Sequence, residues 1–272
     1  MSTAAGLAER RPARGVVLPA TSVRWQRALG PLALLVLWQL LSSSGLVSER
    51  VLAAPSTVLD TAWTLASSGE LSRHLWVSLG RVLRGLSIGV STGLALALVA
   101  GLFKLGEDLL DPPIQMLRTL PVLALVPLFI LWFGIGETPK VALVALGTLF
   151  PVYLNTYAGI RGIDNKLIEA ATSIGLKRWS LIWHVVLPGA LPSALVGLRY
   201  SLGVAWLILV ISEQINATAG IGYLMMNARE FLRTDIIVVG LLVYSLLGLL
   251  TDALVRALER RVLAWRVTFA GR

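Results

Sequence analysis

Residues that could carry catalytic or metal chemistry are scarce in this chain of 272 residues. It has no cysteine, which excludes disulfides and thiolate metal sites, and its two histidines, His74 and His184, lie far apart in sequence. Neither an HExxH zinc motif nor a GxxxxGK(S/T) phosphate-binding loop occurs. We therefore expect no catalytic residue, no bound metal and no bound cofactor, and we predict that the protein is not an enzyme.

The residues best suited to contact another molecule lie in one polar stretch, 164–188, between two long apolar blocks. Asp164 is predicted to cap a helix and Gly175 to end it, because a short acid suits the first position and glycine tolerates a left-handed end. Helical spacing gives this helix one narrow apolar face, made of Leu167, Ala170, Ala171 and Ile174. A second segment, 176–187, is predicted to carry five apolar residues on one side before Pro188: Leu176, Trp179, Ile182, Trp183 and Val186.

Two interpretations of this stretch stay open from spacing alone. Small alanines allow a short helix to lie in the groove of a partner protein. An amphipathic helix can equally lie on lipid headgroups, with its apolar face toward the acyl chains. Under both interpretations, the apolar segments on either side must hold the stretch at a membrane surface.

The composition is that of an integral membrane protein. Hydrophobic residues make up 56% of the chain and charged residues 14%, with a mean hydropathy of +0.77. A soluble domain has roughly 25% charged residues. The net charge of +9 fits cytoplasmic loops that follow the positive-inside rule, so we expect membrane lipid and no nucleic acid as a partner.

Six apolar blocks predict an all-α, polytopic protein with six transmembrane helices. They cover residues 29–41 (extended to 25–45), 86–103, 119–136, 141–160, 190–212 and 236–258. The first block is short enough for a signal peptide, but the cleavage site that follows is a poor match, so we favour an uncleaved span. With the N-terminus inside, 16 of the 24 Lys and Arg residues fall on inner segments and five on outer loops. This bias predicts an N-in, C-in orientation.

The predicted domain organisation follows from these blocks. Residues 1–28 form a flexible basic cytoplasmic tail, 29–262 the transmembrane domain with its inner loop 161–188, and 263–272 a cytoplasmic C-terminal tail. Two prolines in the third block, Pro121 and Pro127, predict a span that is bent or broken.

Few ionisable residues lie deep in the predicted spans, which disfavours a carrier driven by its own ion gradient. Arg81 and Arg84 would lie inside the outer end of the second span and must face protein or water. Glu213, at the outer end of the fifth span, is interpreted as part of a gate region or of a structural ion pair. Asp252 and Arg256 are four residues apart and are predicted to pair.

Several motifs resemble one family of transporters. Glu169-Ala170-Ala171, followed by Gly175 and by Leu187-Pro188, resembles the EAA loop of permease subunits of binding-protein-dependent ABC importers. The EAA match is specific, and the likeness covers nearly the whole chain from about residue 70, where it resembles the nitrate/sulfonate/taurine branch; that branch also includes ligands other than sulfonates. The likeness is carried by residues 111–118, 130–137, 150–156 and 220–224, and the run 226–235 resembles aliphatic-sulfonate permeases.

The resemblance implies a permease subunit in the bacterial cytoplasmic (inner) membrane. It implies a homodimer of this chain, a cytoplasmic ABC ATPase dimer that binds ATP and Mg²⁺, and a periplasmic or lipid-anchored solute-binding protein. The loop would be the coupling helix that docks on the ATPase, through Glu169, Ala170, Ala171, Gly175 and Leu176. Aliphatic sulfonates are the expected solute; taurine, nitrate or another small ligand is the alternative, and a stand-alone channel or carrier is less favoured.

A path for an anionic sulfonate needs hydrogen-bond donors without a tight trap. Polarity and approximate depth select six candidates for the translocation path: Gln115, Arg118, Asn155, Tyr157, Arg199 and Ser212. For each of them, a contact between helices or at the membrane interface is the competing interpretation.

Overall fold

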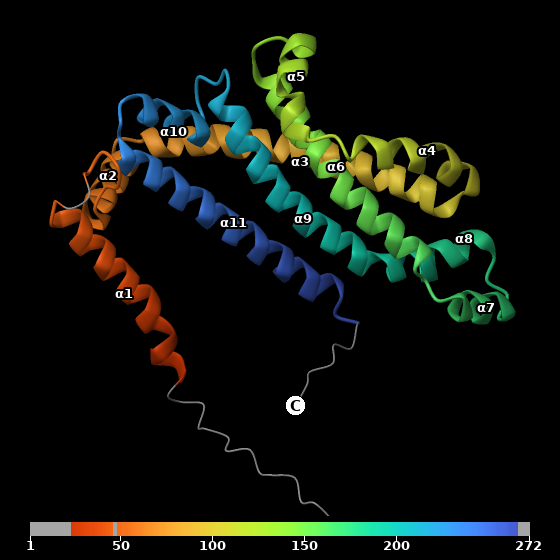
Figure 1. Ribbon diagram of the computed structural model, residues 1–272. Coiled ribbons are helices and arrows are strands. Elements are labelled where there is room, and N and C mark those ends of the chain that lie inside the picture. The colour runs from red at the N-terminus through yellow and green to blue at the C-terminus, as the bar shows by residue number, and fades with distance from the viewer. Residues whose placement is uncertain (1–22, 46–47, 266–272) are drawn as a thin grey trace, which may run out of the picture.

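The computed structural model describes residues 23–45 and 48–265, and every regular element in these residues is a helix (Figure 1). In chain order they are α1 (Val23–Ser43), α2 (Pro55–Ser67), α3 (Glu70–Leu102), α4 (Lys104–Leu117), η1 (Val122–Leu125, 3-10), α5 (Val126–Phe133), α6 (Glu137–Arg161), α7 (Asn165–Ser173), α8 (Arg178–Leu181), η2 (Ile182–Val186, π), α9 (Leu187–Gln214), α10 (Ile221–Glu230) and α11 (Thr234–Val262). The predicted all-α class is confirmed. The predicted tails lie outside the described residues over 1–22 and 266–272.

Four helices are long and apolar enough to cross a membrane: α3, α6, α11 and the continuous helix Arg178–Gln214 that joins α8, η2 and α9. A fifth candidate span is the pair formed by α4 and the helix 122–133, which meet at a bend of 82°. The apolar part of α1, Leu29–Ser43, is shorter than each of the four long helices. The count of six spans and the N-in, C-in orientation therefore stay predictions.

The second predicted span is much longer than its uncharged block. The sequence placed it at 86–103, but α3 begins at Glu70 and runs for 33 residues. The charged and polar residues of its first half do not end the helix, because several of them are buried against the rest of the bundle. Arg81 and Arg84 therefore lie within a helix, as expected for a span that begins near Ser72.

The third predicted span, 119–136, is broken rather than continuous. A helix, α4, already occupies residues 104–117, where the sequence suggested an inner connecting segment. The chain then turns at Pro121, passes through the short 3-10 helix η1 and restarts as α5, with Pro127 in its first turn. Proline lacks the N–H that would continue a helix, so the prediction of a bent or broken span is confirmed.

The centre of the bundle is a close contact between α3 and α6. The ridge of small residues that the sequence shows on α3 faces α6, and Gly85, Gly89, Gly93 and Ala97 are all buried. A Cβ added at Gly89 would lie 2.0 Å from the Thr148 hydroxyl and 2.3 Å from the backbone oxygen of Ala145. Small residues allow the two backbones to approach this closely, which is a common way to pack helices in membranes.

Replacing Gly89 with alanine should therefore destabilise the protein by about 1–3 kcal/mol, because the added methyl group meets backbone that cannot move aside. Thermal unfolding of the detergent-solubilised protein measures this loss. Gly203→Ala is the matched control, since Gly203 is also helical but has nothing within 4 Å of its added Cβ. Equal unfolding temperatures for the two variants would contradict this account of the contact.

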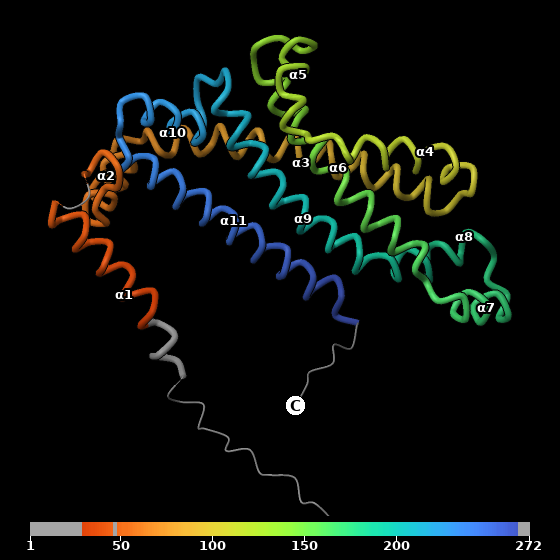
Figure 2. The backbone as a smooth tube through the Cα atoms, viewed as in Figure 1, coloured from red at the N-terminus to blue at the C-terminus, as the bar shows by residue number. Residues whose placement is uncertain are grey.

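The opposite ends of the bundle carry different accessory helices. Figure 2 shows α2 and α10 at one end, beside the starts of α3 and α11, and α7 with α8 at the other end. Helix α1 joins the first of these ends through the segment that precedes α2, where Trp38 Nε1 donates to Ala53 O at 3.1 Å and Ser42 Oγ donates to Leu52 O at 2.9 Å. The two ends are connected by the long helices, which position both sites described next.

Candidate functional site

The polar stretch folds into a helix whose two ends are fixed by local hydrogen bonds. The Asp164 carboxylate accepts from the Lys166 N–H at 2.9 Å, so the predicted N-cap of α7 is confirmed. At the other end Gly175 has φ +86°, a left-handed conformation that glycine adopts without steric cost. The Leu176 N–H donates to Ala171 O and the Gly175 N–H to Thr172 O, at 3.1 and 2.9 Å. This is a Schellman end, as the sequence predicted.

The apolar residues of α7 do not form one buried face. Ala171 is turned inward and buried, whereas Leu167 and Ile174 are 58% and 78% exposed. The prediction placed these residues on one stripe, and the helix presents the larger members of that stripe to the outside. Two exposed apolar side chains beside a capped helix are suited to contact with another surface.

The second predicted segment, 176–187, is divided in the same way. Ile182 and Val186 are buried, but Trp179 and Trp183 are exposed, so the expectation that all share one side is wrong. Residues 182–186 form a π-helix, whose wider turn breaks the 3.6-residue period on which the prediction depended. Nor does the stretch end at Pro188, because that proline occupies the first turn of α9 and the helix runs on.

We call residues 164–186 the α7–α8 hairpin. Its glutamate, Glu169, is exposed, and its backbone oxygen accepts from the hydroxyls of Thr172 and Ser173 at 2.8 Å each. Of the other predicted docking residues, Ala170 and Gly175 are exposed, Leu176 is half-buried, and Ala171 is buried. Figure 1 shows the hairpin projecting from one end of the bundle. Its exposed carboxylate and tryptophans are therefore available to a partner.

Two of the predicted path residues lie in one network between α4 and α6. Gln115 Nε2 donates to Asp111 Oδ1 at 3.1 Å, and Tyr153 donates to the same oxygen at 2.9 Å. One turn away, Tyr157 donates to Glu107 at 2.7 Å. The polar face of α4 is thus directed at α6, and these contacts satisfy its carboxylates.

The other four path candidates lie apart from that network. Asn155 Nδ2 donates to Pro151 O within α6 at 2.8 Å, and the Ser212 hydroxyl donates to Leu209 O within α9 at 3.0 Å. Arg199 binds Glu259 and lies 3.4 Å from Asp252, joining α9 to α11. Arg118 is exposed at the end of α4. The six residues therefore do not form one network of contacts, and their role in a path stays a prediction.

The ion pair predicted between Asp252 and Arg256 is confirmed, and Arg199 joins it. The sequence could not show this third member, because Arg199 lies on another helix.

The setting of Ser87, which lies in a GxSxG sequence at 85–89, excludes this serine as the nucleophile of a hydrolase. Its hydroxyl donates to Leu83 O at 2.7 Å within α3, far from the strand-to-helix turn on which a hydrolase nucleophile sits.

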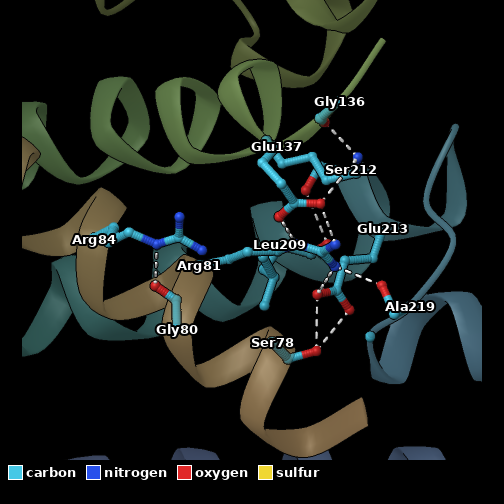
Figure 3. Close-up of polar contacts among 12 residues, drawn as sticks. Ser78, Gly80, Arg81, Arg84, Gly136, Glu137, Leu209, Ser212, Glu213 and Ala219 are labelled. Atoms are coloured by element: carbon cyan, nitrogen blue, oxygen red, sulfur yellow. Dashed lines mark hydrogen bonds and ion pairs between the residues drawn. The ribbon is translucent and has the colours of Figure 1, made fainter. Parts of the chain in front are cut away.

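A buried charge network occupies the end of the bundle opposite the hairpin (Figure 3). Arg81 is 1% exposed, and its Nε and Nη2 each donate to Glu137 at 2.6 Å. Its Nη1 donates to Glu213 at 2.7 Å and to Ala219 O at 2.6 Å. The expectation that Arg81 faces protein is confirmed, and Glu213 belongs to a structural ion pair.

Glu213 makes a further contact with α3 and connects this network to two more helices, α10 and α11. Its carboxylate accepts from the Ser78 hydroxyl at 2.8 Å, from the Gly222 N–H at 2.9 Å and from the Tyr244 hydroxyl at 3.2 Å. Beside it, Lys140 donates to Gly136 O and Asn216 O. Apart from two arginines and one glutamate near predicted span ends, no pattern in the sequence pointed to this arrangement.

No group of three or more His, Cys, Asp or Glu side chains suited to a metal ion occurs among residues 23–45 and 48–265. What these residues do form is a helical bundle with several spans, a capped amphipathic hairpin at one end and a buried ion network at the other. This combination defines a multi-pass membrane protein that exposes an amphipathic hairpin at one end. Residues 89–264 match the family described as binding-protein-dependent transport system inner membrane component, and the chain belongs to that family.

The chain is also similar to two named permease proteins and to one solved transporter structure. It is 54% identical over 239 residues to SsuC of Escherichia coli K12, an aliphatic sulfonates transport permease protein, covering 88% of this chain and 91% of that protein. It is 38% identical over 244 residues to the taurine transport system permease protein TauC of the same bacterium, covering 88% and 89%. A crystal structure of an amino acid ABC transporter with histidines superposes with a TM-score of 0.62 at 21% identity, covering 74% of this chain and 97% of that chain. This last likeness supports the fold alone.

Proposed function

We propose that this chain is the permease subunit of an ATP-driven importer that takes up aliphatic sulfonates across the bacterial cytoplasmic membrane. The observation that carries the proposal is the 54% identity to an aliphatic sulfonates permease protein over nearly the whole chain, compared with 38% to a taurine permease. Membership of the inner membrane component family supports the importer class.

In this proposal a separate cytoplasmic ATPase dimer binds ATP and Mg²⁺, and a periplasmic or lipid-anchored binding protein delivers the solute to a homodimer of this chain. The α7–α8 hairpin is the element that contacts the ATPase. Its capped ends support that role, because a helix fixed at both termini can transmit a displacement without unwinding. The exposed Glu169, Trp179 and Trp183 supply a polar and an aromatic contact surface.

The proposed topology has six spans, with α1 and the bent pair of α4 and residues 122–133 each counted as one, and with both termini inside. That orientation places the hairpin in the cytoplasm and the Arg81 network toward the outer surface. The excess of Lys and Arg on the predicted inner segments supports it. ATP binding would then bias a two-state bundle whose opposite end is closed by a buried ion network.

Taurine is the second candidate solute, supported by the 38% identity to a taurine permease. Taurine shares the sulfonate group but carries an ammonium in place of an alkyl end. The two candidates thus differ in whether the path must accommodate a cation or an apolar chain.

Uptake by the assembled transporter tests the proposal. The chain is purified with its ATPase and binding protein, reconstituted in proteoliposomes and supplied with radiolabelled butanesulfonate, taurine or nitrate. We expect ATP-dependent uptake of butanesulfonate that exceeds uptake of taurine and nitrate, and no uptake when the ATPase carries a substitution of its phosphate-binding lysine. Uptake of none of the three anions would reject the sulfonate assignment, and failure to purify with an ATPase would reject the importer class.

A further inference from the structure

Arg84 is a charged residue in a membrane-spanning helix whose charge the described residues do not neutralise. It is exposed on α3, and among residues 23–45 and 48–265 its guanidinium makes one hydrogen bond, from Nε to Gly80 O of the same helix at 3.0 Å. Arg81, three residues earlier, is by contrast held by two carboxylates. A charge inside a span is costly unless it faces water or a polar partner. The surroundings of Arg84 therefore point to a binding site for a polar partner.

The guanidinium lies at the edge of an open groove of about 350 Å³ between α3 and α6. One wall is apolar and is formed by Ile88, Val141, Ala142 and Ala145. Pockets that hold small ligands range from roughly 300 to 1,000 Å³, and most are apolar with a few polar groups that set orientation. The groove therefore has the size and the chemistry to hold a small molecule with one anionic end and one apolar end.

The nearby carboxylate of Glu137 is hydrogen-bonded to Arg81 and not to the guanidinium of Arg84. Both oxygens of Glu137, which lies on the rim of the groove, accept hydrogen bonds from Arg81. Figure 3 shows Arg84 apart from the Arg81–Glu137–Glu213 network, with its one drawn contact to Gly80. Arg81 thus holds Glu137 in place and leaves the donors of Arg84 to an incoming anion.

We propose that the groove between α3 and α6 binds the alkanesulfonate during its passage, with Arg84 receiving the sulfonate group and the apolar wall receiving the alkyl chain. This inference rests on the proposed sulfonate function and assigns it a site. A guanidinium offers several N–H donors in one plane, which suits the oxygens of a sulfonate. Because the groove is open and has one cation, it holds the solute weakly enough to release it, as a transport path requires.

The same chemistry, an oxyanion on an alkyl chain, also occurs in a membrane phospholipid. The proposal commits to the transported solute, because an alkyl sulfonate fits within the groove and the apolar wall is then a determinant of chain length. A lipid would extend beyond the groove and would respond to vesicle composition instead. The two sources are therefore separable by experiment.

Uptake of methanesulfonate, butanesulfonate and octanesulfonate is measured with the complete transporter in proteoliposomes of phosphatidylglycerol and, separately, of phosphatidylcholine. Arg84→Gln should lower butanesulfonate uptake by about tenfold, because a charged hydrogen bond is lost, and Arg84→Lys should recover part of it. Arg73→Gln is the matched control, since Arg73 is exposed on the same helix but outside the groove, and should leave uptake unchanged. Ala142→Leu, which fills the apolar wall, should shift preference toward methanesulfonate and away from octanesulfonate.

The outcomes distinguish failure of the proposed sulfonate function from failure of the groove as a binding site. If the unaltered transporter takes up none of the sulfonates, the proposed function fails. If it takes them up, but Arg84→Gln matches it and Ala142→Leu leaves chain-length preference unchanged, the groove assignment is overturned and the function stands. A loss in Arg84→Gln that appears only in phosphatidylglycerol vesicles and is equal for every chain length assigns the groove to lipid, which also overturns the proposal.

Discussion

Replacing Glu169 with lysine should abolish the stimulation of ATP hydrolysis by loaded binding protein, while the chain still inserts into the membrane. The reason lies in the position of the carboxylate, which is exposed on α7, where no side-chain hydrogen bond or ion pair to it occurs among the described residues. Its reversal therefore leaves the fold of the hairpin intact. At a protein interface a like-charge contact costs several kcal/mol, which is enough to separate the hairpin from an ATPase.

A second substitution in the hairpin, Gly175→Asp, should also abolish the stimulation of ATP hydrolysis. Here the cause is a new charge at the end of α7. Gly175 has φ +86° and open space around its Cβ, so an aspartate fits but pays about 1–2 kcal/mol for the left-handed backbone and adds a charge. Gly175→Asn pays a similar backbone cost without the charge and is the matched control. Glu230→Lys controls for charge reversal, because Glu230 is exposed on the short helix α10 away from the hairpin.

Both results are measured as the ATPase rate of the reconstituted complex and as co-purification of the ATPase. We expect Glu169→Lys and Gly175→Asp to insert normally and to show only the basal rate, with the two control variants stimulated as before. Stimulated ATPase activity and normal transport in both Glu169→Lys and Gly175→Asp would show that the hairpin does not couple the two proteins.

The largest effect on stability is expected for Arg81→Met, which should lower the free energy of unfolding by about 3–5 kcal/mol. Arg81 is 1% exposed and neutralises Glu213, which is also 1% exposed, together with Glu137. Without the guanidinium, Glu213 stays buried beside Ser78 and Tyr244 with no cation to compensate it. An uncompensated buried charge is much more costly than the loss of a surface ion pair.

Unfolding of the detergent-solubilised protein, followed by tryptophan fluorescence, measures this effect. Arg73→Met removes an exposed arginine from the same helix and should change stability by less than about 1 kcal/mol. Glu213→Gln removes the charge but keeps hydrogen-bonding capacity, so it should be less damaging than Arg81→Met. An Arg81→Met protein that unfolds at the same point as Arg73→Met would contradict the assigned role of the network.

The features that the sequence predicted correctly are those that depend on neighbouring residues. Asp164 caps α7 and Gly175 ends it because each acts within one turn of its own position. The small residues on α3, among them Gly85 and Gly89, share one face because helical spacing alone aligns them. The family resemblance rested on such local motifs as well.

The features that the sequence could not predict depend on residues distant along the chain. Polarity selected Tyr157 and Arg199 as path residues, but each is hydrogen-bonded to a carboxylate on another helix that spacing could not assign to it. The direction of Trp179 and Trp183 was missed because a π-turn changed the helical period. Arg84 was recognised as a charge that needs water or protein, but the groove beside it requires the placement of α6.

The helix that begins in the hairpin continues through the bundle, so a rigid tilt of this helix would displace both of its ends. It runs from Arg178 to Gln214 without interruption over 37 residues, or about 55 Å at 1.5 Å per residue. Near its midpoint the helix packs closely on α6, because a Cβ added at Gly197 would lie 2.8 Å from Pro151 O. A tilt of about 5° around the contact at Gly197 would move each end of the helix by about 2 Å, in opposite directions. The hairpin is at one end of the helix and Glu213 is at the other. A displacement of about 2 Å is comparable with the 2.7 Å length of the hydrogen bond between Arg81 and Glu213, so it would be large enough to break that bond.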